Sequence, residues 1–136
     1  MNNEYIDITS YDGDGYKPMI DYESWRVAVL RYHEELEIHN IKTMQKHDQT
    51  DEVFVLLEGN CTLFVGGKGD NIGEIDGIAM EPYKFYNVKK GVWHTHTLDK
   101  KGMVLIVENK DTTDNNSPTR ELTVKQVELL CKVFGL

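Results

Sequence analysis

"QKHDQTDEVFVLLEG", residues Gln45 to Gly59, decides how the fold of this chain is interpreted. It joins a polar segment containing His47 to an apolar run that begins after Glu52 and is closed by Gly59. The run predicts a buried β-strand, because it is short, rich in branched side chains and followed by a turn residue. An acid at the head of a buried strand is unfavourable unless it is paired or coordinated. Glu52 therefore indicates either a strand end that reaches water or one part of a polar site.

A second apolar run, "CTLFVGG", follows almost at once. Gly59 and Asn60 tolerate the positive φ of tight turns, so we expect the two runs to form a β-hairpin. Further strands are expected in residues 25–32, from Ile41 onward, within residues 74–82 and 84–91, and at residues 103–109. About eight short strands with turn signals between them are typical of an antiparallel barrel or a jelly roll.

One clear helix is predicted near the C-terminus, in "TVKQVELLCKVFG". Thr123 and Gln126 have the spacing of a capping box. The residues expected on its apolar face are Val124, Val127, Leu130, Cys131 and Phe134. The predicted fold class is all-β, an antiparallel barrel or jelly roll followed by a short C-terminal helix. We expect one domain over residues 1–136, with the barrel core at about 25–109 and a loop and helix at 110–136.

The composition bears on partners and compartment. Fifteen Lys and Arg residues stand against 23 Asp and Glu residues, which gives a formal net charge of −8. This balance argues against nucleic acid or an anionic membrane as a partner, because both are recognised by clustered cations. No apolar run approaches the ~20 residues of a membrane helix. The first residues, "MNNEYIDITS", lack a secretory signal pattern, so we expect a cytoplasmic protein in which Cys61 and Cys131 are reduced.

Histidine spacing provides the first indication of chemistry. In an extended strand, side chains at positions i and i+2 share a face. His94 and His96 therefore point the same way, and Gln45 and His47 do so if their segment is extended. The other two histidines, His33 and His39, have no partner at an informative spacing and are expected at the surface.

The opening stretch resembles the first motif of the cupin superfamily. In that motif two histidines one residue apart are followed by three or four residues, a glutamate, six residues and a glycine. Glu52 and Gly59 have the six residues between them, and His47 stands at the second histidine position, with four residues between it and Glu52. "KKGVWH" resembles the core of the second cupin motif, with two residues between Gly91 and His94. The two motifs occur in the expected order and together extend over residues 45–98.

The resemblance implies a divalent metal site, because metal-binding cupins use the two histidines and glutamate of the first motif and the histidine of the second. Carried over by position, the ligands are Gln45, His47, Glu52 and His94, so glutamine replaces the first histidine. Two imidazoles and one carboxylate suit Fe(II), Mn, Zn or Ni, and Gln45 could add a carbonyl oxygen. His96 is an additional candidate ligand or acid/base group, which makes Glu52 and His96 the catalytic candidates. The missing imidazole keeps a metal-free cupin as an alternative.

Two classes of function remain open from the sequence. The first is a small enzyme with lyase, isomerase or dioxygenase chemistry on a small polar metabolite; a weaker similarity to ureidoglycolate lyase, seen in "GVWHTHTL" and "VLIVEN", favours a small polar acid. The second is a non-catalytic module that binds a small ligand without metal. In either case Trp93 and Tyr86 are candidate substrate-binding residues at the mouth of the barrel.

The resemblance also implies a homodimer, because cupins commonly associate through edge strands. The segment "YDGDGYKPMIDYESWRV" is the candidate edge strand. Pro18 within it supports this placement, since proline lacks the amide hydrogen that an interior strand would use.

Overall fold

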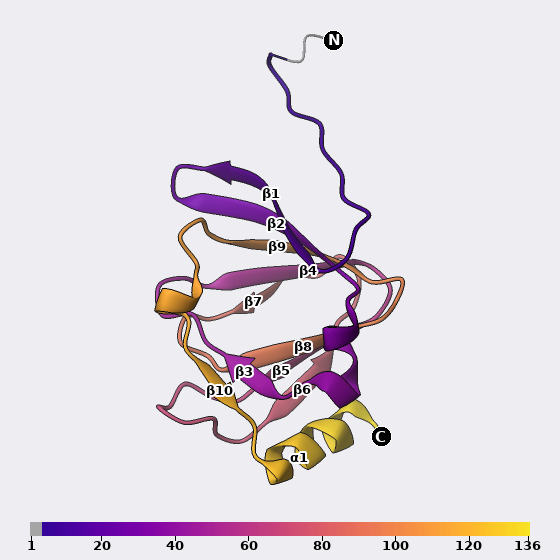
Figure 1. Ribbon diagram of the computed structural model, residues 1–136, viewed down its shortest axis with the longest axis vertical. Helices are drawn as coiled ribbons and strands as arrows, with labels where there is room; N and C mark the ends of the chain where they lie inside the picture. Colours follow the sequence, from indigo (N-terminus) through magenta and orange to yellow (C-terminus); the bar gives the residue numbers. More distant parts are fainter. Residues whose placement is uncertain (1–3) are drawn as a thin grey trace.

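The computed structural model describes residues 4–136 and shows two antiparallel five-stranded sheets that face each other (Figure 1). The first sheet has the order β1 (Tyr16–Tyr22), β2 (Trp25–Arg31), β9 (Met103–Asn109), β4 (Glu52–Glu58) and β7 (Tyr86–Val88). The second has the order β10 (Thr119–Glu121), β3 (Thr43–Gln45), β8 (His94–Leu98), β5 (Cys61–Val65) and β6 (Asp76–Ala79). The predicted all-β jelly roll with a C-terminal helix is confirmed. Within the described residues the two sheets stay separate, so the jelly roll is not a closed barrel.

The main core fills the space between the sheets. Alternation along β9 shows how it forms, since Val104 and Ile106 are buried while the residues between them are only partly covered. The buried members of this cluster are Ala28, Leu30, Phe54, Leu56, Cys61, Leu63, Met80, Val88, Leu98, Val104 and Ile106. Each large apolar side chain enclosed here contributes roughly 1.5–3 kcal/mol to folding.

A second, smaller core lies on the other face of the β3–β8–β5 sheet, beneath the helix α1 (Val124–Phe134). Its buried members are Ile38, Ile41, Met44, Phe64, Ile75, Trp93 and Leu130. The predicted capping box is present, because the Thr123 hydroxyl accepts from the Gln126 amide at 3.1 Å and the Gln126 side chain accepts from the Thr123 amide at 2.9 Å. The predicted apolar face is too wide, however: Leu130 is fully buried, whereas Val124 is 78% exposed.

The predicted hairpin between the two apolar runs is wrong. β4 pairs with β9 and β7, and β5 pairs with β8 and β6, so the link at Gly59 carries the chain from one sheet to the other. Phe54 and Leu63 still face the same core from opposite sheets. A glycine turn between two apolar strands is equally compatible with a hairpin and with such a corner, which is why the local pattern did not distinguish them.

Two other segments bear on the predictions. Before β3 the chain makes two short 3-10 turns, Glu34–Leu36 and Ile38–Asn40, so the strand expected from Ile41 begins only at Thr43. β1 is an edge strand as expected, and the register shifts just after Pro18. Cys61 and Cys131 are both free thiols. No helix among residues 4–136 has the length and apolar character needed to cross a membrane.

Substitution of Gly59 tests the corner between the sheets. Gly59 has φ of +75°, and an added Cβ would lie 2.4 Å from Asp99 Oδ1 and 2.7 Å from the backbone of Gly102. We expect Gly59→Ala to lower the free energy of unfolding by about 2–4 kcal/mol, from left-handed backbone strain plus crowding. Gly15 is the matched control, because its φ is +76° and nothing lies within 4 Å of its added Cβ. Urea unfolding of both variants measures the difference, and equal losses would contradict a role for crowding.

Candidate metal centre

A cavity of about 380 Å³ lies between the two sheets and brings together the polar residues that the sequence singled out. Its lining includes Gln45, His47, Glu52, His94 and His96. These residues come from both sheets: Gln45 ends β3, Glu52 begins β4, and His94 begins β8. Residues from two motifs that are far apart in the sequence thus meet because β3 ends, and β4 and β8 begin, at the same end of the jelly roll.

Three of these residues form a compact cluster. Glu52 Oε1 lies 3.0 Å from His47 Nε2 and 3.0 Å from His94 Nε2. One ligand atom from each residue falls within 4.8 Å of the others, and all three side chains are buried. His47, Glu52 and His94 therefore form a two-histidine, one-carboxylate set that could hold a metal ion.

Hydrogen bonds on the far side of each ring define which nitrogen carries the proton. His94 Nδ1 lies 2.9 Å from the carbonyl oxygen of Val92, which can only accept, so Nδ1 is the protonated nitrogen. His47 Nδ1 lies 2.7 Å from Ser117 Oγ, and that hydroxyl donates its own hydrogen to Asn116 Oδ1. Ser117 therefore accepts from His47 Nδ1. In both rings this outer bond engages Nδ1, so Nε2 is the atom that faces Glu52.

Two imidazole nitrogens and a carboxylate oxygen gathered in a buried space form a donor set that suits a divalent metal ion. The 3.0 Å separations between Glu52 Oε1 and the two Nε2 atoms are also hydrogen-bond lengths. Burial by itself would raise the pKa of Glu52, but hydrogen bonds and charge from His47 and His94 outweigh it and hold the pKa well below its usual range. The donor set thus fits a metal ion.

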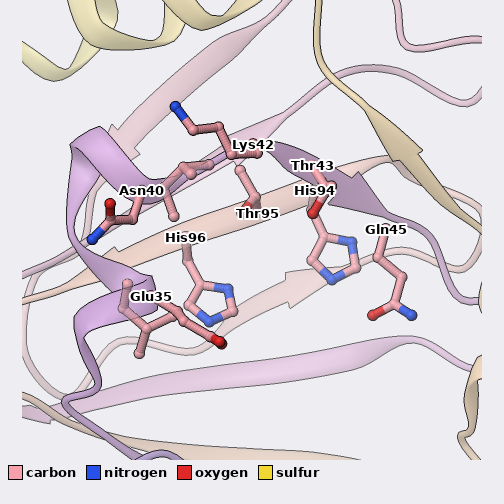
Figure 2. A pocket seen from close by; sticks show the side chains of 10 residues that line it. Glu35, Asn40, Lys42, Thr43, Gln45, His94, Thr95 and His96 are labelled. Atoms are coloured by element: carbon pink, nitrogen blue, oxygen red, sulfur yellow. The ribbon is translucent and has the colours of Figure 1, made fainter.

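Gln45, which stands where the first cupin histidine is expected, is held beside this cluster. It pairs with His94 across β3 and β8, and its side-chain nitrogen donates to the carbonyl oxygen of Ser117 at 2.9 Å. Because that bond engages the amide nitrogen, the amide oxygen is the atom directed toward the His94 side (Figure 2). Ser117 therefore positions both His47, through its hydroxyl, and Gln45, through its carbonyl.

His96 lies two residues after His94 on β8, and its side chain is on the same face of the strand. Its ring packs against Phe54, with centroids 5.4 Å apart. Burial lowers the pKa of His96 to about 4, despite the opposing charge of Glu52, so the ring is neutral at neutral pH. Its Nδ1 atom is buried and has no hydrogen-bond partner among the described residues.

The two aromatic residues expected to contact substrate lie elsewhere. Trp93 is 1% exposed in the core beneath α1, and its indole nitrogen donates to the carbonyl oxygen of Gly69. Tyr86 packs at the edge of the main core, where its hydroxyl accepts from the Glu81 amide. Neither lines the cavity around Glu52. The physical reason for Trp93 is the alternation along the strand, which directs it to the face opposite His94.

Sequence reasoning missed a second carboxyl group in the cavity. Glu108 is 7% exposed on β9, and the Tyr16 hydroxyl donates to its Oε1 at 2.6 Å. Burial raises the pKa of Glu108 to about 7, and the negative charge of Glu52 adds to this effect. The signal was present in "MVLIVEN", since Glu108 occupies the inward-facing position that follows Val104 and Ile106.

Comparisons with known proteins bear on the fold. No protein-family profile matches the chain, and no curated protein sequence matches it. Among solved structures it is similar to a cupin-2 domain protein from Shewanella frigidimarina, with 17% identity over 74% of this chain and 85% of the other and a TM-score of 0.52. KdgF from Halomonas sp. is 11% identical over 84% and 94% of the two chains, with a TM-score of 0.53. Hydroquinone 1,2-dioxygenase from Sphingomonas sp. is 11% identical over 68% and 63%, with a TM-score of 0.51.

These likenesses agree with the two facing antiparallel sheets. His47 and Glu52 from the first motif and His94 from the second meet at one point between the sheets. The chain has the fold of the cupin superfamily.

Proposed function

We propose that this protein binds one divalent metal ion, Fe, Mn, Zn or Ni, and acts on a small polar metabolite in the cavity between its sheets. The observation that carries the proposal is the convergence of His47 Nε2 and His94 Nε2 on Glu52 Oε1 at 3.0 Å. The ligands are His47, Glu52 and His94, with the amide oxygen of Gln45 as the fourth. This set leaves further coordination positions for water or substrate.

The residues around the cluster give the proposed site its chemistry. A bound metal ion supplies a Lewis acid for a carboxylate or carbonyl oxygen of the substrate. Neutral His96, with its Nδ1 unpartnered, is available to take up a proton or to accept a hydrogen bond from the substrate. Tyr16 and Glu108 add a hydroxyl and a carboxyl group on the β1–β9 side of the cavity. Lyase, isomerase and dioxygenase reactions are the candidates for such a site.

The alternative function is binding of a small molecule without metal or catalysis. It is favoured by the same 3.0 Å distances, because they are also normal lengths for hydrogen bonds that each imidazole donates from Nε2 to Glu52. In that state the two N–H groups compensate the buried carboxylate without a metal ion. Gln45 stands where the first motif histidine is expected, so one strong metal ligand is missing. This also favours the function without metal.

The homodimer is also part of the proposal. β1 leaves one edge of the first sheet unpaired within the described residues, and Tyr22 and Trp25 expose apolar surface beside it. An edge of this kind can pair with the same edge of a second copy. Light scattering should report twice the mass of the chain, and a monomer at micromolar concentration would contradict the dimer.

Metal content tests the proposed site directly. After loading and dialysis, the parent protein should retain about one divalent ion per chain, measured by elemental analysis. His94→Ala and Glu52→Gln should each reduce retention to near background, because each removes one of three buried ligands. His39→Ala is the matched control, since this histidine lies outside the cavity and should not change retention. Background metal in the parent protein would favour the alternative function.

Ser117 tests the outer layer of the site. Ser117→Ala removes the hydroxyl that accepts from His47 Nδ1 while leaving the backbone carbonyl that holds Gln45. We expect metal affinity to fall about 10- to 100-fold with stoichiometry unchanged, because the ring loses its fixed orientation and tautomer. Competition with a chromogenic chelator measures the change. An affinity equal to that of the parent would show that Ser117 does not position the ligand.

Glu108 gives a pH-dependent prediction for the metal-free protein. Its pKa is raised from 4.5 to about 7 on folding, so the native state holds a proton that the unfolded chain releases between these values. The contribution of Glu108 to stability therefore falls as pH rises from about 4.5 to 7 and stays low above that. Glu108→Gln, which keeps an oxygen for Tyr16, should be more stable than the parent at pH 8 and should lose this advantage toward pH 5. Urea unfolding at pH 5, 7 and 8 checks the trend, and an advantage independent of pH would contradict it.

A further inference from the structure

β3 and β8 are neighbours in the second sheet, yet they pair at only one position. Within the described residues their ladder consists of Gln45 and His94 alone. In an antiparallel ladder the next pair on this side would be Thr43 with His96. That pair is missing, so the two strands separate directly beside the candidate metal centre.

The hydrogen-bond pattern shows which backbone groups face the separation. Trp93 and Asp99, which flank β8, bond toward the β5 side, so alternation directs the N–H and C=O of His96 toward β3. Lys42 and Lys46, which flank β3, bond toward the β10 side, so alternation directs the N–H and C=O of Thr43 toward β8. Each strand thus presents one donor and one acceptor to the opening.

Packing beneath the helix explains why the strands separate. Ile38 and Ile41, just before β3, are buried in the core beneath α1 together with Leu130. This anchorage draws the chain toward the helix and away from β8. Leu36, from the first 3-10 turn, closes the far end of the opening. We call the opening between Thr43 and His96 the seam.

A cavity of about 510 Å³ occupies the seam, and Figure 2 shows the side chains that line it. Gln45, His94 and His96 line both this cavity and the one that contains Glu52, so the seam begins at the candidate metal centre. His96 brings a third polar group, because its buried Nδ1 has no partner among the described residues. The His96 Nδ1 atom is buried, and buried polar groups normally acquire a hydrogen-bond partner.

We infer that the seam is a substrate subsite that takes an amide group, and that the substrate is a small carboxylate carrying an amide a few atoms from its acid end. An amide offers one C=O and one N–H together, which complements the donor and acceptor that each strand presents. His94 and His96 are two residues apart, about 6.6 Å along β8 at ~3.3 Å per residue. A carboxylate at the Glu52 cluster therefore places an amide beside His96. This inference rests on the proposed function and adds the class of substrate to it.

Three small carboxylates of similar shape test the subsite on Zn²⁺-loaded protein by calorimetric titration. N-acetylglycine has both the C=O and the N–H of an amide, levulinate keeps only the C=O, and isocaproate has neither. We expect N-acetylglycine to bind about 3- to 10-fold more tightly than levulinate, with isocaproate weakest, because each satisfied hydrogen bond contributes modestly. Equal affinities for the three, or no binding of any, would overturn the inference.

Thr43→Leu supplies the second arm, because it narrows the seam without touching the Glu52 cluster. It should abolish the preference for N-acetylglycine while leaving Zn²⁺ retention unchanged. Thr119→Leu on β10 is the matched control, since Thr119 is exposed, pairs with the outer side of β3 and lines neither cavity. A preference that survives Thr43→Leu would overturn the inference. Zn²⁺ retention is measured separately: its absence refutes the proposed metal centre, and binding of N-methylacetamide, which carries the amide without a carboxylate, to metal-free protein and to Thr43→Leu then still decides the seam.

Discussion

The buried carboxylate of Glu52 is the constraint on which the arrangement of the site depends. A carboxylate in an apolar interior is unfavourable unless a positive charge or several hydrogen bonds accompany it, and here two imidazoles supply that compensation at 3.0 Å. Each imidazole is itself held by a group behind it, Ser117 for His47 and the Val92 carbonyl for His94. These outer bonds engage Nδ1 of each ring and leave both Nε2 atoms facing Glu52, an arrangement that could hold a metal ion.

The arrangement of the two sheets brings the residues of this site together. Glu52 belongs to the first sheet and His94 to the second, so the site bridges the two layers at one end of the jelly roll. The apolar cluster around Phe54 and Leu98 fills the rest of the space between the sheets. Polar residues are thereby concentrated where the apolar core ends, and two cavities that share His94 and His96 border them.

The packing that stabilises the second core also opens the seam. Burial of Ile38 and Ile41 beneath α1 takes the chain away from β8, and the ladder between β3 and β8 ends after Gln45 and His94. A regular sheet would have satisfied the backbone of His96 with that of Thr43. Packing against the helix and pairing with β8 thus place opposite requirements on the segment that leads into β3. The backbone groups of Thr43 and His96 that would otherwise pair lie beside the site.

Much of the fold and part of the site could be read from local patterns. The apolar run after Glu52, the strand "MVLIVEN" and the Thr123–Gln126 capping box are each decided by residues close in sequence, and each is confirmed. The spacing of two motifs likewise indicated that His47, Glu52 and His94 belong together. Patterns of this kind are legible because periodicity and capping act over a few residues.

Tertiary structure alone decided the rest, because these features depend on which sheet a strand joins. The turn at Gly59 is a corner between sheets and not a hairpin, and no local signal separates the two. Trp93 faces the helix core, and Glu108 faces the cavity, because their positions follow from strand alternation combined with the placement of α1 and β9. The sequence by itself determined the longer strands after Glu52 and at 103–109, the helix, and the motif spacing of His47, Glu52 and His94. Long-range packing determined what those elements face, since burial is a property of the assembled layers.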